Sequence, residues 1–375
     1  MSETSIATPS SIAWLGFALG ALFGAVGNRT NFCTLGAVAD IVAMGDWNRM
    51  RMWLLAIAVA ILGSQALQYT GIVDLSKSIY TASRLKWLSS IAGGMAFGIG
   101  MALASGCGSK TLIRIGGGNL KSLVVFAFMA ISAYMTLRGL FALWRVELLD
   151  ARAIALPTQQ DLPSLLTITG ALARPQAILL CSLVAGGILA GFALAPRDFR
   201  RFDNLLGGIV VGLVVAGGWY VTGHLGYIAE HPETLQEAFV GTNSGRAESL
   251  TFVAPFAYTL ELLMFWSDAS KSVSFGIAAA LGVVAGSSAW AIASGSFRLE
   301  SFRDPADMLR HIAGGILMGF GGVTALGCTI GQGISGMSTL ALGSMLTLAA
   351  IIAGCFIALK LELWLAMGHG KFVLK

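Results

Sequence analysis

Charged residues are scarce in this chain. Only 11% of its 375 residues are Asp, Glu, Lys or Arg, whereas soluble domains contain about 25%. So few charges exclude an ordinary water-soluble protein. The net charge is +5, and the Lys and Arg residues stand near the ends of apolar segments. This distribution is typical of the basic bias at membrane interfaces and does not resemble a nucleic-acid-binding surface.

Metal ligands and disulfide partners are also in short supply. The four histidines stand apart from the five cysteines, and no two cysteines form a CxxC pair. Structural zinc sites need closely spaced ligands. An odd number of cysteines in apolar segments argues against a disulfide framework. Nucleotide-binding motifs of the Walker type are absent from the sequence as well. We therefore expect no metal site, no cofactor and no enzymatic activity.

Long apolar runs dominate the rest of the chain. Hydrophobic residues make up 56% of it, and the mean hydropathy is +0.77. Several runs reach the roughly 20 residues that a helix needs to span the hydrocarbon layer. The chain is therefore predicted to be all-α, a polytopic transmembrane helical protein. The apolar runs are 11–27, 53–73, 87–104, 121–143, 176–196, 205–222, 251–266, 273–295, 311–326 and 338–359.

Three of these runs, 87–104, 251–266 and 311–326, are too short for simple spans. They suit broken or re-entrant half-helices, which enter the membrane without crossing it. Lipid cannot satisfy free backbone amides. Such breaks are therefore tolerated only inside the protein or along a watery cavity.

Two stretches of the chain nearly repeat each other. Residues 91–107 read IAGGMAFGIGMALASGC and residues 312–328 read IAGGILMGFGGVTALGC, with nine of the seventeen positions identical. Each stretch ends on a cysteine in a glycine-rich break, and the two cysteines are 221 residues apart. Duplication combined with broken helices is typical of transporters that bind substrate between two repeats. The simpler alternative is two helices that share a small-residue packing face.

The repeat divides a single transmembrane domain, residues 1–375, into two pseudo-symmetric halves. The first repeat is predicted over about 11–145 and the second over about 175–365. A polar, proline-containing segment of about 146–174 is predicted to link them. A second polar interruption, at 224–250, is expected to form an extramembrane loop with a short amphipathic helix.

The five cysteines fall into two groups by local context. Cys181 and Cys355 lie in uninterrupted apolar helix, where a cysteine usually packs as a small residue. Cys33, Cys107 and Cys328 each lie in a break and precede small or polar residues that can begin a new helix. These three are the candidate substrate-binding residues.

Residues beside these three cysteines are candidates for supporting roles. Thr34, Ser109 and Thr329 can act as N-caps of the helices that follow. A helix N-terminus presents free N–H groups and the positive end of its dipole, and both favour an anion. The second and third breaks add further supporting candidates, which are Lys110, Gly106 and Gly327. For Lys110 the alternative is a side chain that snorkels to the membrane interface.

The thiol itself narrows the class of substrate. It is a weak, polarizable donor that matches a soft sulfur atom better than hard oxygens. A pathway lined by cysteines would hold sulfate or phosphate weakly and pass sulfur-bearing anions preferentially. The alternatives are a transporter of selenite or another small oxyanion and, in a different class, a thiol-based membrane redox or metal-binding protein.

Three motifs together resemble a known family. They are FCTLGAVAD at 32–40, SGCG at 105–108 and GCTIGQG at 327–333. They resemble the YeeE/YedE family of bacterial inner-membrane sulfur transporters, and the similarity covers nearly the whole chain. The resemblance implies an hourglass-like helical fold and uptake of thiosulfate through a narrow neck. It also implies that Cys33, Cys107 and Cys328 pass the anion along by S–H···S contacts.

The resemblance further implies a cytoplasmic partner, a small TusA-like sulfur-carrier protein (TsuB-like or YeeD-like) that accepts the sulfur. One position departs from the family pattern, because Lys110 stands where a small neutral residue is expected. This difference leaves the exact substrate open among sulfur and selenium anions. Basic residues occur in nearly every connection, so the sequence predicts no membrane orientation.

Overall fold

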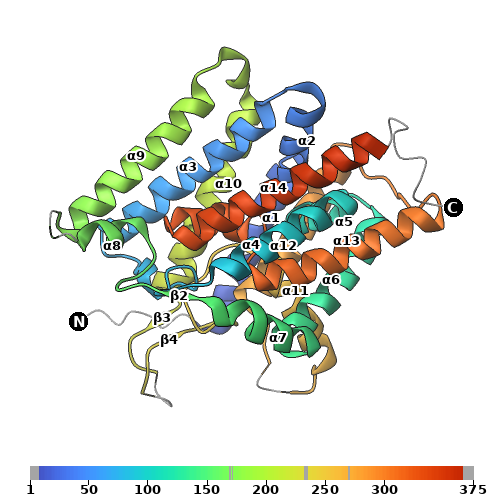
Figure 1. Ribbon diagram of the computed structural model, residues 1–375. Helices are drawn as coiled ribbons and strands as arrows, with labels where there is room; N and C mark the ends of the chain where they lie inside the picture. The colour runs from blue at the N-terminus through green and yellow to red at the C-terminus, as the bar shows by residue number, and fades with distance from the viewer. Residues whose placement is uncertain (1–7, 169, 171, 232–234, 269–270, 366–375) are drawn as a thin grey trace.

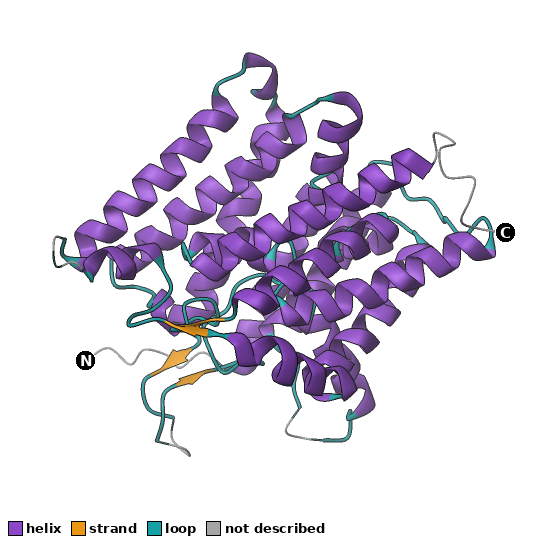
Figure 2. Ribbon diagram, in the orientation of Figure 1, coloured by secondary structure: helices purple, strands orange, loops and turns teal. Residues whose placement is uncertain are grey.

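The computed structural model of the protein is built almost entirely of helices (Figure 2). It describes residues 8–168, 170, 172–231, 235–268 and 271–365. Within these ranges, eight helical segments are long and apolar enough to cross a membrane. The prediction of an all-α, multi-pass membrane protein is therefore confirmed.

The longer α-helices follow the apolar runs of the sequence, and some shorter ones lie between the runs. They are α1 (Pro9–Arg29), α2 (Thr34–Met44), α3 (Asn48–Tyr69), α4 (Trp87–Leu103), α5 (Gly108–Gly116), α6 (Leu120–Arg138), α7 (Leu140–Trp144), α8 (Leu162–Thr167), α9 (Arg174–Leu194), α10 (Phe202–Tyr220), α11 (Ala254–Met264), α12 (Phe275–Ala293), α13 (Pro305–Thr324) and α14 (Leu342–Trp364). Shorter helical segments of π or 3-10 type are η1 (Leu75–Lys77), η2 (Arg145–Leu149), η3 (Asp150–Arg152), η4 (Arg197–Phe199), η5 (Val221–Leu225) and η6 (Gly331–Gly336).

Capping residues set several of these bounds. Thr8, Ser274 and Asp304 each accept a hydrogen bond from a first-turn amide, at the starts of α1, α12 and α13 respectively. Such caps satisfy amides that have no partner inside the helix. Gly45 ends α2 with a φ of 69°, a left-handed conformation that glycine adopts without steric cost.

Two short antiparallel strand pairs lie outside the helices. β1 (Arg84–Leu85) pairs with β2 (Ile154–Ala155), and β3 (Tyr227–Ile228) pairs with β4 (Ala238–Phe239). The second pair shows that the prediction of an amphipathic helix in the 224–250 loop is wrong for the described part of that loop. A cross-strand aromatic contact explains the hairpin, because the Tyr227 and Phe239 rings lie 5.3 Å apart between centroids.

Small residues let the long helices approach closely. Gly24 on α1 faces the Val283 carbonyl of α12, and a Cβ at Gly24 would collide with that oxygen. Gly286 on α12 makes the reciprocal approach to the Ala21 carbonyl of α1. Close backbone contact of this kind holds membrane helices together where lipid removes the hydrophobic driving force.

The helix pairs recur in a regular way. α1 packs on α12 and α10 packs on α3, while α4 packs on α14 and α6 packs on α13. The two helices that carry the repeated sequence, α4 and α13, also pack on each other. Figure 1 shows α9, α3, α14 and α13 running in the same diagonal direction across the view. The internal repeat and its boundaries stay a prediction.

Candidate functional site

The three candidate cysteines each follow the same kind of helix ending. α1, α4 and α13 end in Schellman motifs, in which amides beyond the last turn donate back to its carbonyl oxygens. The outer bonds run, donor first, from Phe32 to Gly27 (3.1 Å), from Gly106 to Met101 (3.0 Å) and from Gly327 to Gly322 (2.7 Å). The predicted supporting glycines therefore belong to these turns. The backbone turns sharply just before each cysteine.

The residue two positions before each cysteine has a left-handed backbone. Asn31, Ser105 and Leu326 have φ values of 52°, 56° and 59°. This conformation costs an L-residue about 1–2 kcal/mol, and only Asn tolerates it readily. The same strained geometry at all three breaks means that the surrounding structure holds it in place.

The cysteines themselves begin the next helical segments. Thr34, Ser109 and Thr329 are predicted from the sequence as N-caps, and this prediction is wrong. After each break, the first hydrogen bond from an amide to a carbonyl four residues earlier is accepted by the cysteine carbonyl. The donors are the Ala37 N–H to Cys33 (3.0 Å), the Thr111 N–H to Cys107 (2.9 Å) and the Gln332 N–H to Cys328 (2.7 Å). Cys33 and Cys107 thus occupy the N-cap positions of α2 and α5, whereas η6 begins three residues after Cys328 and has Ile330 as its N-cap.

The sulfur atoms lie beside backbone or hydroxyl donors at these starts. Cys33 Sγ accepts a hydrogen bond from the Gly36 N–H (3.4 Å), and Cys328 Sγ accepts one from the Gly331 N–H (3.4 Å). Cys107 Sγ instead contacts the Ser109 hydroxyl (3.3 Å). The thiols of Cys33 and Cys107 therefore lie at the N-termini of α2 and α5, where negative charge is favoured.

The three breaks come together inside the protein. Cys33 is 9% exposed, Cys107 is 1% exposed and Cys328 is fully buried. The Cys107 thiol lies within electrostatic range of both Cys33 and Cys328. Cys107 is thus a buried neighbour of two cysteines that are far from it in the sequence.

The other two cysteines differ from each other. Cys181 lies on α9 within electrostatic range of Asp161. Cys355 on α14 is fully buried and comes within electrostatic range of Cys33 and Cys107, a proximity that the sequence does not reveal. Gly98 of α4 approaches the backbone amide of Cys355 closely. The small thiol side chain suits this tight contact between α4 and α14.

Two hydroxyls beside the thiols are left without partners. Thr34 and Thr329 are 1% and 0% exposed, and neither Oγ1 atom has a hydrogen-bond partner among the described residues. Leaving a buried hydroxyl unsatisfied costs about 1–3 kcal/mol. Each hydroxyl directly follows a candidate cysteine in the sequence, so both are available to a ligand that reaches the thiols.

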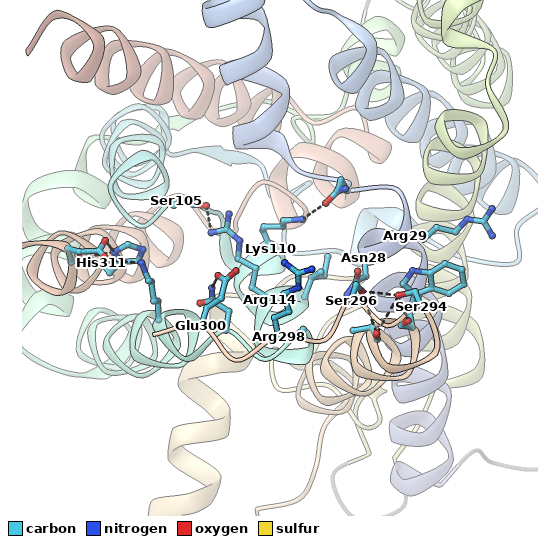
Figure 3. Close-up of a pocket in the computed structure, with 18 residues that line it drawn as sticks. Asn28, Arg29, Ser105, Lys110, Arg114, Ser294, Ser296, Arg298, Glu300 and His311 are labelled. Carbon is cyan, nitrogen blue, oxygen red and sulfur yellow. Dashed lines mark hydrogen bonds and ion pairs between the residues drawn. The ribbon is translucent and has the colours of Figure 1, made fainter. Parts of the chain in front are cut away.

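A cavity of about 720 Å³ opens beside the first two breaks (Figure 3). Its lining includes Asn31 and Ser105 from the breaks and Lys110 and Arg114 from α5. Lys110 Nζ lies 3.4 Å from Asn31 Oδ1, and Arg114 Nη1 donates to the Ser105 carbonyl (2.6 Å). Two cations one turn apart on α5 thus tie both left-handed residues to the cavity wall.

Lys110 therefore lies at the cavity rather than on a lipid-facing surface. Its ammonium group is within electrostatic range of Cys33 and Cys107. Lys110 therefore lies where it could take the supporting role predicted for it. Ser109, the other predicted supporting side chain on α5, contacts the Cys107 sulfur.

The third break faces a much smaller cavity. Leu326 and Gln332 line a space of about 20 Å³ together with Tyr80, Arg84 and Lys86. A space of this size holds about one water molecule. Among the described residues, neither cavity has a candidate cysteine in its lining, and the cavity at the third break is far smaller than the one at the first two breaks.

Phe252 lies between two of the breaks and was not indicated by the sequence. Its fully buried side chain fills the space beside Gly108, with its Cβ 3.6 Å from where a Gly108 Cβ would be. Its backbone amide comes within interacting range of the Cys328 sulfur. The sequence holds only a short signal for this role: Phe252 stands two residues before α11, as Phe32 stands two residues before α2.

The first motif also positions a cation that sequence reasoning missed. Asp40 Oδ2 lies 3.2 Å from Arg49 Nε, and the Arg49 guanidinium covers Gly36 so closely that a Cβ there would collide with it. The glycine and aspartate of FCTLGAVAD therefore place a guanidinium on the first turn of α2, next to the amide that donates to Cys33.

The donor set offers little to a metal ion. All five cysteines are free thiols. In the part of the chain that the structure describes, no group of three or more His, Cys, Asp or Glu side chains is arranged to hold a metal. The site therefore offers thiols, hydroxyls, amides and cations, a combination suited to a small anion.

Comparisons with known proteins point in the same direction. Residues 29–357 match the model of a family described as sulphur transport, and all three cysteine breaks lie inside the match. The chain is 29% identical over 340 residues to the thiosulfate transporter TsuA of Escherichia coli (strain K12), covering 85% of this chain and 86% of that protein. It is 25% identical over 348 residues to the thiosulfate transporter TsuA of Spirochaeta thermophila, covering 91% and 96% respectively.

Proposed function

The chain belongs to the sulphur transport family, the YeeE/YedE family, and from this premise we propose that it takes up thiosulfate past its three internal thiols. The family and the two relatives are transporters rather than enzymes, and this chain is a multi-pass membrane transporter of sulfur-containing anions. Thiosulfate is the proposed substrate because both relatives are named thiosulfate transporters.

The observation that carries the proposal is the convergence of Cys33, Cys107 and Cys328 at three matching helix breaks. Thiosulfate has a soft terminal sulfur and three hard oxygens. The thiols can meet the sulfur through weak S–H···S contacts, while nearby amides stabilise the negative charge. A weak donor suits transport, because an anion that binds too tightly at one thiol would not move to the next.

The neighbouring hydroxyls extend this pathway. Thr34 and Thr329 have buried, unpartnered oxygens beside two of the thiols, and Ser109 already contacts the third. A passing anion would satisfy the two free hydroxyls for a short time. Gly106 and Gly327 contribute through the Schellman turns that direct the thiols inward.

The two halves of the chain would supply opposite ends of the pathway. In this proposal α4, Cys107, α5 and α6 correspond to α13, Cys328, η6 and α14. The neck is the region between them, where Phe252 lies beside Gly108 and near Cys328. α8 would lie in the linker between the repeats, while α9 would begin the second repeat and packs on α3.

Two further parts of the proposal concern the cellular setting. The family resemblance places such a transporter in the bacterial inner membrane. The same resemblance implies a cytoplasmic TusA-like carrier. This carrier would remove sulfur from the imported anion and so keep uptake favourable. Such a sink would drive uptake without an ion-coupling site in the transporter.

The test is growth rescue in a bacterium that lacks its own thiosulfate importers, with thiosulfate as the sole sulfur source. Wild type should rescue growth, Cys107→Ala and Cys328→Ala should fail, and Cys181→Ala should match wild type. Membrane levels of each variant are measured by immunoblot so that lost expression is not read as lost transport. Rescue by Cys107→Ala at wild-type expression would contradict the proposal.

A second candidate function is uptake of selenite or another small oxyanion. The cationic cavity lined by Lys110 and Arg114 favours it, because hard oxygens pair well with such groups. Competition decides between the two functions. Excess selenite should inhibit labelled thiosulfate uptake weakly if thiosulfate is the substrate and strongly if selenite is.

A further inference from the structure

Two adjoining cavities lie at the opposite end of α12 from the large cavity beside the first two breaks. The large cavity includes Ala291 and Ser294 at the end of that helix, whereas the two cavities include Ala278 and the N-cap Ser274 at its start. α12 has 19 residues, so its ends lie about 28 Å apart at 1.5 Å per residue. That length is close to the thickness of the hydrocarbon layer. The two cavities therefore lie at the other face of the membrane.

The first of them, which we call the interfacial cavity, is polar and has a volume of about 270 Å³. Its wall includes Arg138 at the end of α6, Glu261 on α11 and Lys271, which precedes α12. Arg138 Nη1 lies 3.1 Å from Glu261 Oε1, and Lys271 Nζ lies 2.6 Å from the same oxygen. Two cations from distant parts of the chain thus converge on one atom.

This carboxylate cannot neutralise both cations. The Glu261 side chain is 6% exposed, whereas the Arg138 and Lys271 side chains are 58% and 32% exposed. The negative charge is therefore buried beneath the two positive charges. The accessible surface of the interfacial cavity is left positive, and a charge of this sign attracts an anionic group.

The second cavity, which we call the apolar cavity, has a volume of about 570 Å³ and runs along α1 and α12. Exposed Trp14 and Leu281 contribute to its wall, together with Phe17. The Trp14 and Phe17 rings meet edge to face, with their centroids 5.8 Å apart. Pro9 and Ser272 line both cavities, so the two adjoin.

The apolar cavity extends in the direction that a lipid chain would take. It begins at Pro9, beside the interfacial cavity, and reaches Phe17, which is about 12 Å further along α1 at the helical rise. Since α1 and α12 are both long and apolar enough to cross the membrane, their starts lie near the membrane surface and the wall leads toward the middle of the bilayer. A water-soluble anion fits the interfacial cavity alone, whereas an amphiphile with an anionic head fits both.

We propose that the two cavities bind one anionic phospholipid, with its phosphate on Arg138 and Lys271 and an acyl chain along Trp14, Phe17 and Leu281. A guanidinium can bind two phosphate oxygens at once, and an ammonium adds a compact charge. Basic pockets between transmembrane helices bind anionic headgroups in this way. A zwitterionic lipid fits less well, because its own cation would face the two basic side chains. The site lies apart from the thiols and goes beyond the proposed function.

The experiment uses the full-length purified protein in detergent, with phosphatidylglycerol and phosphatidylcholine of identical acyl chains as probes. Thermal unfolding is followed as each lipid is added. Wild type should show a larger rise in Tm with phosphatidylglycerol, and Arg138→Gln and Lys271→Gln should each weaken its apparent affinity for that lipid by about threefold to tenfold. Arg152→Gln, which changes an exposed arginine outside both cavities, is the matched control and should keep the full response.

Two further variants separate a lipid site from a purely structural ion pair. Glu261→Gln frees both cations and should strengthen phosphatidylglycerol binding several-fold, whatever it does to the stability of the lipid-free protein. Leu281→Ser removes part of the apolar wall and should weaken binding. Leu183→Ser changes a similarly exposed leucine on α9, outside both cavities, and should bind as wild type does.

Several outcomes would overturn the site. They are equal stabilisation of wild type by the two lipids, a response reproduced by water-soluble glycerol 3-phosphate, and a Glu261→Gln variant that binds phosphatidylglycerol no more tightly than wild type. Light scattering adds a last check on the apolar cavity. A dimer that Leu281→Ser dissociates would assign this wall to a second copy of the chain and would also overturn the proposal.

Discussion

The breaks at Cys107 and Cys328 share a sequence and a backbone but differ in their surroundings. Both follow the I-A-G-G helices, both have a left-handed residue two positions earlier, and both cysteine carbonyls accept a hydrogen bond from the amide four residues later. The first break opens through Ser105 onto a cavity of about 720 Å³, whereas the second meets about 20 Å³ beside Leu326.

This difference distinguishes the role of the repeated backbone from the role of the side chains around it. The repeated backbone decides where each thiol lies, because the Schellman turn and the cap together fix the cysteine. The side chains around it decide how the thiol is reached. The break at Cys107 adjoins a wide cavity with Lys110 and Arg114 in its wall, while the break at Cys328 adjoins a narrow one with Arg84 and Lys86 in its wall.

The largest expected effect comes from replacing each thiol with a hydroxyl. Cys107→Ser and Cys328→Ser keep nearly the same size but replace a soft donor with a hard one. Each should lower the initial rate of labelled thiosulfate uptake by about tenfold or more, equivalent to about 1.4 kcal/mol. Cys181→Ser is the control. A loss at only one of the two positions would break the comparison, because the two thiols would then have unequal roles.

The next effect concerns the shared backbone. A β-branched residue fits poorly at positive φ, so Ser105→Val and Leu326→Val should each destabilise the protein by about 1–2 kcal/mol. Thermal unfolding in detergent measures both losses. Leu326→Gly should remove the strain and lower the Tm least of the three. Unequal losses for the two valine variants would show that the breaks do not store the same strain.

Removing the hydroxyl of Thr34 or Thr329 should have a smaller effect, in which stability rises and transport falls. Thr329→Val removes a buried, unpartnered oxygen and should raise stability by about 1 kcal/mol while lowering thiosulfate uptake several-fold. Thr34→Val should behave in the same way. Thr136→Val is the matched control, because its hydroxyl donates to the Ser132 carbonyl (2.7 Å). It should lose stability and keep uptake. Stabilised variants with full uptake would exclude a role for these hydroxyls in binding.

The smallest expected effect lies near the narrow end. Burial raises the pKa of Glu248 to about 7, partly opposed by the hydrogen bond from the Ser244 hydroxyl (2.8 Å). The folded state therefore binds a proton more readily than the unfolded state does, and stability should fall as the pH rises from about 4.5 to about 7. Glu248→Gln should flatten this part of the Tm profile. Exposed Glu230→Gln is the control, and an unchanged slope in Glu248→Gln would contradict the assignment.

Much of the fold could be predicted from the sequence, because apolar length and helix breaks are local properties. The observed helices follow the apolar runs, and the three cysteines lie at breaks. The cap positions were misplaced because the turn residues are Asn31, Ser105 and Leu326 rather than glycines. Glycine is the usual signal for a left-handed turn, and at two of the breaks it stands one residue later.

The cavity could not be predicted, because it depends on contacts between distant parts of the chain. Arg298 joins Arg114 in the lining of the large cavity through the backbone bonds between its loop and the end of α5. Phe252 likewise comes near Cys328 through the burial of residues 247–253 among the helices. No local pattern around either residue distinguishes it from an ordinary loop residue.

The account depends most on contact between the transported anion and the thiols of Cys33, Cys107 and Cys328 at the three helix breaks. The direct measurement is the rate at which N-ethylmaleimide labels each cysteine of the purified protein, followed by mass spectrometry with and without thiosulfate. Thiosulfate should slow the labelling of Cys33, Cys107 and Cys328 and leave Cys181 unchanged. Unchanged labelling of these three thiols, or equal slowing at Cys181, would contradict the account.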